Sequence, residues 1–266
     1  MPGTAVALRL DDVGAASKAH EVYGLTRLRL GGWSLPFPGN ALFLKYLPPI
    51  KRWAPYRELG AADWETITAA LQAASARMTV AVTAGWVERD GRVVPYPQKF
   101  PAAARALRDA EQRGVVEIAN HGYTHCVLEG RRYLPRAFSG NRSEHREFYD
   151  WMPAATHREH LRRAQEILRQ FFGVPVVTFV PPGNVFTRVT LDAAAEVGLH
   201  YVSCLGAGRL GDVAGLTPIP DDAVLALHDR DVVVHGLPWL ERLLQERPGG
   251  LTTVRAVGER LEKVRR

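Results

Sequence analysis

Two adjacent carboxylates, Asp11 and Asp12, stand directly after an apolar run over residues 5–10 (AVALRL) that is typical of a buried strand. Two like charges side by side repel each other unless a cation or a shared proton compensates them. Taken alone, the pair is more typical of a helix N-cap beside a solvated neighbour. The two carboxylates alone do not show whether a cation binds beside them.

Two histidines lie in the stretch NHGYTH, residues 120–125, after a second predicted strand over residues 115–119. His121 and His125 are four residues apart, so on a helical turn both imidazoles would share one face, about 5–6 Å apart at Cβ. That separation suits one metal ion. A carboxylate from elsewhere would complete a set of two His and one Asp, with open positions for water and substrate. A lone histidine is more often a satisfied core or surface residue, but this pair favours a metal site.

The stretch FVPPGNVF, residues 179–186, follows a predicted strand over residues 175–180. The prolines stiffen the turn, and a glycine lets the backbone approach a ligand closely. The backbone N–H group of Gly183 or Asn184 is a candidate donor to a developing oxyanion. An ordinary turn from strand to helix is the alternative.

Residues 231–240 (DVVVHGLPWL) read as a strand over residues 231–234 that ends at His235. His228, in VLALHDRD, has a similar setting and competes with His235 as a candidate proton donor. Trp239 is a candidate apolar wall for substrate, and simple helix packing is its alternative.

These four features share one position, because each lies just past the carboxyl end of a predicted strand. We expect strands near residues 5–10, 78–83, 115–119, 175–180, 200–204, 223–227, 231–234 and 251–254. We expect helices near residues 62–76, 101–113, 157–172, 187–197, 237–246 and 256–264. Continuous apolar strands separated by helices predict a parallel sheet covered on both faces, and seven or eight such units favour a β/α barrel. Active sites in such barrels form at the carboxyl ends of the strands.

Two segments, residues 26–60 and 126–156, break this alternation. The first is rich in Pro, Gly and aromatic residues, and the second is polar and rich in Arg. We expect both to be rim loops or insertions over the open end of the barrel, because long loops in compact domains are usually functional. Without internal repeats or a clear linker, residues 1–266 are predicted to form a single domain.

The composition narrows the class of protein. Net charge is +6, and only five of the 34 basic residues are Lys, which fits either a solvated basic surface or an anionic substrate. The sequence has no basic run interleaved with aromatic residues, so nucleic-acid binding is not expected, and no apolar run is long enough to span a membrane.

The only cysteines, Cys126 and Cys204, fit a reducing compartment. Since no signal peptide is visible, a cytoplasmic location is expected. The oligomeric state is left open.

The motifs resemble those of the polysaccharide deacetylases, also called family 4 carbohydrate esterases or the NodB-homology family. RLDDV (residues 9–13) stands where the family has Thr-Phe-Asp-Asp-Gly, and HGYTH stands where it has His-Ser/Thr-x-x-His. VPPGN occupies the place of Arg-x-Pro, and the strand-like VVVH with its following helix occupies the place of the final Leu-x-His motif. The resemblance covers most of the chain in order.

This resemblance implies a distorted barrel of seven or eight β/α units. It also implies one divalent metal, zinc first and Co²⁺, Ni²⁺, Mn²⁺ or Fe²⁺ as alternatives, held by Asp12, His121 and His125. Asp11 would be the general base and His235 the general acid.

The sequence also departs from the family pattern. Val180 stands where the family's Arg would brace the base Asp, Val13 replaces a Gly, and Gly122 replaces a hydroxyl residue. Another group must then orient Asp11, and a divergent subgroup or an altered substrate is expected.

The function that follows is a metal-dependent hydrolase that removes an N-acetyl or other N-acyl group. The expected substrate is an intracellular sugar, a nucleotide-linked or lipid-linked sugar, or a small glycoside. One alternative is a catalytically silent barrel that binds carbohydrate, and another is a metal-dependent hydrolase of non-sugar amides. An iron oxygenase would use the same two-His, one-Asp set, but the α/β alternation argues against it.

Overall fold

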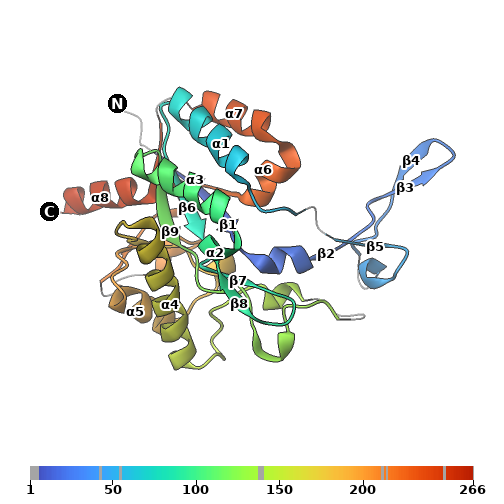
Figure 1. Cartoon of the computed structure of the whole chain (residues 1–266), viewed down its shortest axis with the longest axis horizontal. Helices are drawn as coiled ribbons and strands as arrows, with labels where there is room; N and C mark the ends of the chain where they lie inside the picture. Colours follow the sequence, from blue (N-terminus) through green and yellow to red (C-terminus); the bar gives the residue numbers. More distant parts are fainter. Residues whose placement is uncertain are drawn as a thin grey trace.

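The structure is a computed structural model of the chain, and it describes residues 6–41, 44–53, 56–136, 141–210, 213, 215–247 and 250–265. Its centre is one curled sheet of eight strands, all paired in parallel (Figure 1). The strands in spatial order are β12 (Thr217–Pro218), β11 (Tyr201–Val202), β10 (Thr178–Phe179), β9 (Val116–Asn120), β6 (Met78–Val82), β1 (Val6–Val13) and β13 (Val224–His228), with β14 (Leu251–Thr252) paired to β1. No pairing joins β12 to β13 in the described ranges, so the sheet is a distorted half-barrel.

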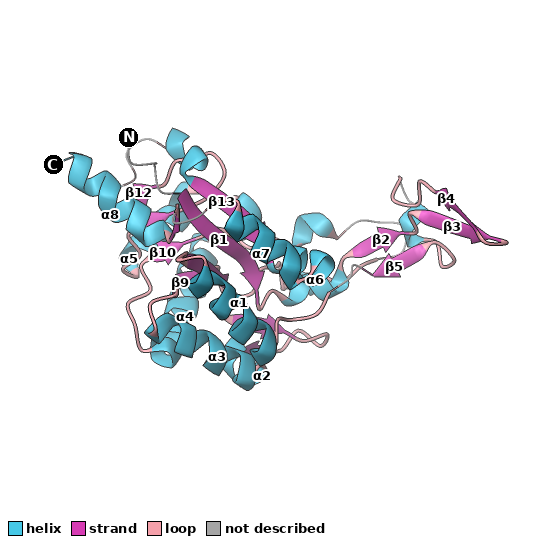
Figure 2. Ribbon diagram, turned by 90° about the horizontal axis from the view of Figure 1, so that it is seen from above, coloured by secondary structure: helices cyan, strands magenta, loops and turns pink. Residues whose placement is uncertain are grey.

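Helices cover the sheet, as Figure 2 shows from above. They are α1 (Ala61–Ala73), α2 (Tyr96–Lys99), α3 (Pro101–Gln112), α4 (Ala154–Phe172), α5 (Arg188–Glu196), α6 (Asp229–His235), α7 (Leu237–Gln245) and α8 (Val254–Arg265). The side chains that they turn inward, such as Trp64, Leu107 and Leu168, are fully buried. All five residues of β6 are buried as well, which is the pattern of a parallel sheet covered on both faces.

The predicted strands and helices are found in the structure in the predicted order, except that residues 231–234 belong to helix α6 and not to a strand. Strand β12 at the edge of the sheet and the short helix α2 were not predicted. The His228 N–H group donates to Asp231 Oδ2 (2.8 Å), and this cap starts a helix at Asp229. The cap outweighs the preference of the three valines for a strand. His235 therefore ends a helix, which corrects the setting predicted for it.

The two segments that broke the alternation emerge beside the carboxyl ends of the strands. Residues 126–156 contain the 3₁₀ turns Glu129–Arg131 and Arg142–Glu144. The described residues from 22 to 53 (22–41 and 44–53) form an arm of two antiparallel pairs, β2 (Val22–Gly24) with β5 (Lys51–Trp53) and β3 (Arg27–Leu30) with β4 (Trp33–Pro36). This arm extends away from the half-barrel (Figures 1 and 2) and does not fold back over the sheet, as a rim loop would.

A further hairpin, β7 (Gly85–Val87) with β8 (Val93–Pro95), follows β6. Among the described helices, none has the length and apolar character needed to cross a membrane.

Candidate active site

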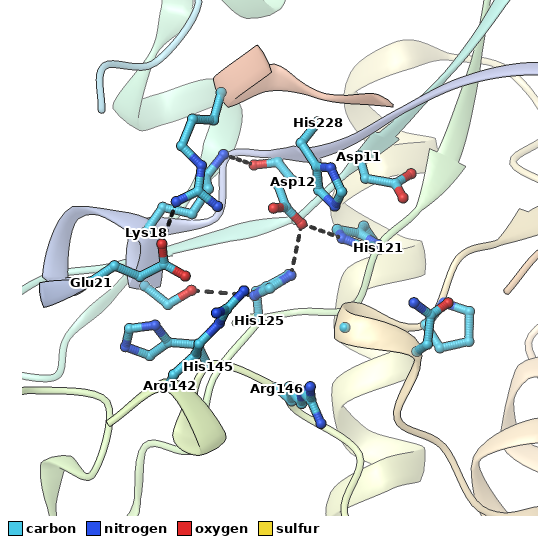
Figure 3. Close-up of a pocket in the computed structure, with 15 residues that line it drawn as sticks. Asp11, Asp12, Lys18, Glu21, His121, His125, Arg142, His145, Arg146 and His228 are labelled. Atoms are coloured by element: carbon cyan, nitrogen blue, oxygen red, sulfur yellow. Dashed lines mark hydrogen bonds and ion pairs between the residues drawn. The ribbon is translucent and has the colours of Figure 1, made fainter. Parts of the chain in front are cut away.

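Asp11 and Asp12 lie where β1 leaves the regular ladder, because the register with β6 shifts between Leu10 and Val13. Alternate side chains of a strand point to opposite faces, so Arg9 and Asp11 share one face. Asp12 has a left-handed backbone conformation with a φ angle of 72°. That conformation is uncommon outside glycine, and such residues gather at functional sites. At this bend Asp12 lines the same pocket as Asp11, although the two are adjacent in the chain (Figure 3).

His121 and His125 come from the loop after β9, and this loop is not the helical turn that the spacing predicted. Gly122 (φ 78°) and His125 (φ 53°) both have left-handed conformations, and these turn the chain back on itself. The two imidazole rings lie with their centroids 4.9 Å apart. The loop thus brings the pair together, as expected, by a different backbone geometry.

The three side chains converge on one point. Asp12 Oδ1 lies 3.1 Å from His121 Nε2 and 3.0 Å from His125 Nε2. The other ring nitrogens have partners: His121 Nδ1 lies 2.6 Å from the Val180 carbonyl oxygen, and His125 Nδ1 lies 3.2 Å from Ser17 Oγ. Such partners hold the rings so that both Nε2 atoms face the pocket.

This geometry fits a metal ion. Because a carbonyl oxygen can only accept, His121 Nδ1 carries the proton, and the neutral ring then turns an Nε2 lone pair toward a carboxylate oxygen. Two acceptors facing each other require a positive charge between them, from a proton or a metal. His125 Nε2 is buried, and Asp12 Oδ1 at 3.0 Å is the only polar partner that it has among the described residues. The donor set of two imidazoles and one carboxylate is that of a divalent metal site with open positions.

The lowered pKa of the Asp12 carboxyl also fits a metal site. Burial raises the pKa of this carboxyl, but the charge on His125 and hydrogen bonds with His121 and His125 hold the pKa well below its usual range. An ionised carboxylate is the form that binds a metal ion, and a metal at this point would take the place of the proton between Asp12 and His125.

Glu147 fixes the loop that carries the two histidines. Its buried carboxylate accepts the backbone N–H groups of Tyr123, Thr124 and His125 at 3.0–3.2 Å, and His160 Nδ1 lies 2.6 Å from it. A Cβ atom at residue 122 would lie 2.2 Å from Glu147 Oε2. Only glycine fits there, which explains why Gly122 replaces the family's hydroxyl residue.

Arg9 is the group that orients Asp11. Its Nε and Nη2 atoms donate to the two Asp11 carboxylate oxygens at 2.8 Å each, and both residues are buried. Arg9 Nη1 also donates to the backbone oxygen (2.9 Å) and to Oγ (2.6 Å) of Ser203, which follows β11. The Val180 side chain instead packs with Ala81 and Ala119. The family pattern has an Arg at the position of Val180, after β10. In this chain Arg9 on β1 supplies the guanidinium group instead.

A second buried charge cluster supports Asp12 from behind. Lys18 Nζ donates to the Asp12 backbone oxygen and to Asp229 Oδ2. Burial raises the pKa of Asp229 to about 7, although Lys18 opposes the shift. Glu58 Oε1 accepts the Gly14 N–H at 3.0 Å and so holds the turn after β1.

His228 lies at the pocket and His235 does not. His228 is paired with Asp11 in the register of β13 and β1, and it lines the pocket with Asp11 and Asp12 (Figure 3). His235 is exposed at the end of α6, beside Trp239, which packs against the core. The prediction that His235 and Trp239 belong to the site is therefore wrong. His235 was expected to end a strand that is a helix, and Trp239 has the helix-packing role that was its alternative.

Gly183 and Asn184 line the pocket, as predicted. The Asn184 N–H donates to the Pro181 oxygen at 3.0 Å, so this donor is occupied within the turn. For the Gly183 N–H no hydrogen-bond partner is found in the described part of the chain. The aliphatic stem of Arg146 fills the space that a Cβ atom at Gly183 would need (2.7 Å).

The loop over residues 126–156 supplies basic side chains to the pocket wall. Arg142 and Arg146 are exposed, line the pocket, and have no carboxylate partner within the described ranges. His145 beside them is buried, and burial lowers its pKa to about 4 although a hydrogen bond with the Tyr133 backbone opposes this. The pocket joins a candidate cation site to a basic wall.

The model of the polysaccharide deacetylase family matches residues 57–202, which is more than half of the chain. The chain belongs to the polysaccharide deacetylase family. The matched range contains both histidines, whereas Asp11 and Asp12 lie outside it, so their convergence on the histidines comes from the structure. A comparison with curated protein sequences finds no match.

The chain resembles solved structures with which it shares little sequence identity, and three of them illustrate this. A family 4 pseudoenzyme from Bacillus anthracis is 15% identical, with 75% of this chain and 62% of that chain covered and a TM-score of 0.48. A deacetylase domain from Bordetella bronchiseptica is 23% identical, with 64% and 68% covered and a TM-score of 0.44. A family 4 carbohydrate esterase from Streptomyces lividans, solved with acetate, is 16% identical, with 74% and 86% covered and a TM-score of 0.42. The present chain thus spans less than two thirds of the Bacillus anthracis chain.

Sequence reasoning missed Arg9, Glu147, Ser17 and Lys18. A signal existed for Arg9, since a charged residue in an apolar strand two positions before Asp11 must share its face. No local signal marks Glu147, because its partners are backbone N–H groups more than twenty residues away.

We predict that Asp12→Ala and His125→Ala each lose bound zinc, from about one ion per chain to a small fraction, because a site with three protein ligands cannot spare one. Metal analysis of protein purified without a His tag measures this. His200→Ala, which changes an exposed histidine outside the pocket, is the control and keeps its zinc. Full zinc content in His125→Ala would show that the ligand set is wrong.

We predict that Gly122→Ala weakens zinc binding about 10- to 100-fold, because the new Cβ displaces Glu147 from the loop. Gly130→Ala is the matched control, since its φ of 57° is also left-handed but no atom lies within 4 Å of the added Cβ. Titration with a zinc chelator compares the two variants. Equal zinc affinities in both would contradict the role given to Glu147.

Proposed function

We propose that this protein is a metal-dependent hydrolase that removes an N-acyl group, with acetyl the first candidate, from a sugar. The observation that carries the proposal is the convergence of Asp12, His121 and His125 on one point. Membership of the polysaccharide deacetylase family supports the reaction class.

Asp11 is proposed as the general base. A bound divalent ion would lower the pKa of water and polarise the amide carbonyl. Asp11 lies at the same rim and accepts a proton from the attacking water, while the two hydrogen bonds from Arg9 hold the carboxylate in one orientation. Arg9 thereby supplies the brace that Val180 lacks.

His228 is proposed as the general acid, in place of the His235 of the sequence prediction. An amine leaves an amide carbon only when it is protonated, so a donor is needed on the pocket wall. His228 meets this need because it lines the pocket, its side chain is 51% exposed, and it is the neighbour of Asp11 across the strands. The N–H group of Gly183 is the proposed oxyanion donor.

The proposed substrate carries an anionic group near the acylated amine. Arg142 and Arg146 offer two guanidinium groups to the pocket, and paired guanidiniums favour phosphate or carboxylate. A sugar phosphate, a nucleotide-linked sugar or a lipid-linked sugar has this chemistry. The cytoplasmic location inferred from the sequence stays a prediction.

Incubation of the zinc-loaded protein with a panel of N-acetylated compounds tests the proposal. We expect acetate release from N-acetyl sugars that carry phosphate, weaker release from neutral ones, and none from the metal-free protein. Binding of sugars without release would favour the silent barrel. Release from simple acylated amines alone would favour a non-sugar amidase.

A pair of histidine variants tests the assignment of the acid. We predict that His228→Ala keeps its zinc and loses turnover by about 10²- to 10⁴-fold, the usual contribution of general acid catalysis. His235→Ala is the matched control and keeps wild-type turnover. The reverse result would restore the sequence prediction.

Arg9→Lys tests the brace. The variant keeps the charge but not the two-pronged hydrogen bonding, so we predict a fall in kcat of about 10²-fold with zinc content and KM unchanged. Thermal unfolding of the variant separates loss of position from loss of fold. An unchanged kcat in folded Arg9→Lys would mean that Asp11 needs no such brace.

A further inference from the structure

The hairpin β3–β4 at the end of the arm has one apolar face and one basic face. Its register pairs Leu28 with Leu35 and Leu30 with Trp33, so these four side chains share one face of the ribbon. Arg27 and Arg29 therefore lie on the opposite face. Arg27 Nε donates to Ser34 Oγ at 2.9 Å, across the strands of that polar face.

The apolar face is uncovered. Trp33 is 75% exposed, Leu30 is 62% exposed and Leu35 is 48% exposed, and on β5 of the same arm Trp53 is 46% exposed. Isolated apolar residues on a surface are ordinary, but an aligned set on a protruding element marks an interaction site. A two-stranded ribbon is marginal in water, so it gains stability when something covers its apolar face.

The charge of the arm indicates what covers it. No Asp or Glu occurs from residue 22 to residue 53, while the segment carries five basic residues. They are Arg27, Arg29, Lys45, Lys51 and Arg52. A basic segment with exposed Trp and Leu matches an anionic bilayer surface, where Trp prefers the interface and Lys and Arg meet lipid phosphates. A protein partner of ordinary mixed charge has no such match.

Close contacts at the base of the arm fix the direction in which the arm extends. Gly24 and Gly39 cross so closely that a Cβ atom on Gly24 would lie 1.9 Å from the Gly39 oxygen. The Tyr23 hydroxyl accepts a hydrogen bond of 2.9 Å from Arg230, which also lines the candidate active site. A second pocket, lined by Tyr23, Lys45 and Arg142 among others, lies between the active site and the arm.

We propose that the arm docks the protein on a membrane surface rich in anionic lipids. The apolar face of β3–β4 enters the boundary between headgroups and acyl chains, and the basic side chains remain at the level of the phosphates. Docking would present the active-site rim to headgroups. The docking does not depend on the proposed hydrolase activity, and its test needs no substrate.

Sedimentation with vesicles tests the proposal. We expect the full chain to bind vesicles of phosphatidylglycerol and phosphatidylcholine at least tenfold better than vesicles of phosphatidylcholine alone, and binding to weaken as salt rises. The double variant Trp33→Ser/Leu35→Ser, and separately Arg27→Glu/Arg29→Glu, should each lose binding by about tenfold or more.

Matched controls use exposed residues of the half-barrel. Trp151→Ser removes another exposed tryptophan, and Arg105→Glu/Arg169→Glu makes the same change of net charge on α3 and α4. Both controls should bind anionic vesicles like the parent, and circular dichroism confirms that all variants are folded.

Three results would overturn the proposal. One is absence of binding to anionic vesicles at low salt. Another is loss of binding that is equal in the hairpin variants and in the controls. The third is a dimer, seen by light scattering without lipid, that Trp33→Ser/Leu35→Ser converts to a monomer, because a second copy of the chain would then cover the apolar face.

Discussion

The candidate site depends on one electrostatic constraint: in a largely buried place, the Nε2 atoms of His121 and His125 lie 3.1 and 3.0 Å from the same carboxylate oxygen of Asp12. Without a positive charge between them, these groups repel. The protein nevertheless holds them there with a left-handed Asp12, a left-handed His125 and hydrogen bonds on the far side of both rings. A left-handed backbone costs free energy at residues other than glycine, and hydrogen bonds to the outer ring nitrogens fix how the imidazoles point. A bound cation explains why the protein keeps this arrangement.

The brace for Asp11 shows how one physical requirement is met from another place in the chain. A buried carboxylate that serves as a base needs a fixed, charged partner, and the family resemblance placed that partner at Val180. In the structure Arg9 reaches the same carboxylate from two residues earlier on the same strand. The Val180 position keeps a role through its backbone carbonyl, which orients His121. Asp11 requires a guanidinium group beside its carboxylate oxygens, and different strands can supply that group.

Periodicity in the sequence predicted a β/α barrel with a parallel sheet, and the α/β class is confirmed, because buried strands and amphipathic helices leave strong patterns. It also located Asp11, Asp12, His121, His125, Gly183 and Asn184 at the rim, since each follows an apolar strand. It failed over residues 231–234, where three valines favoured a strand and a capping interaction from Asp231 to the His228 N–H made a helix. That one local error moved the proposed acid from His228 to His235.

Contacts between distant segments were beyond the reach of sequence patterns. Glu147 meets backbone N–H groups, which carry no residue identity, and the partner of Arg9 at Ser203 lies 194 positions along the chain. The arm is a similar case: its alternating Arg and Leu residues gain meaning only from the register that pairs Leu28 with Leu35 and from its distance from the half-barrel.

X-ray absorption at the zinc edge of the zinc-loaded protein shows whether the metal lies between Asp12 and the two histidines. We expect two imidazole nitrogens at about 2.0–2.1 Å, with oxygen ligands completing the shell and no sulfur. A sulfur shell near about 2.3 Å, or a shell with fewer than two imidazoles, would contradict it, because the metal would then lie elsewhere in the protein.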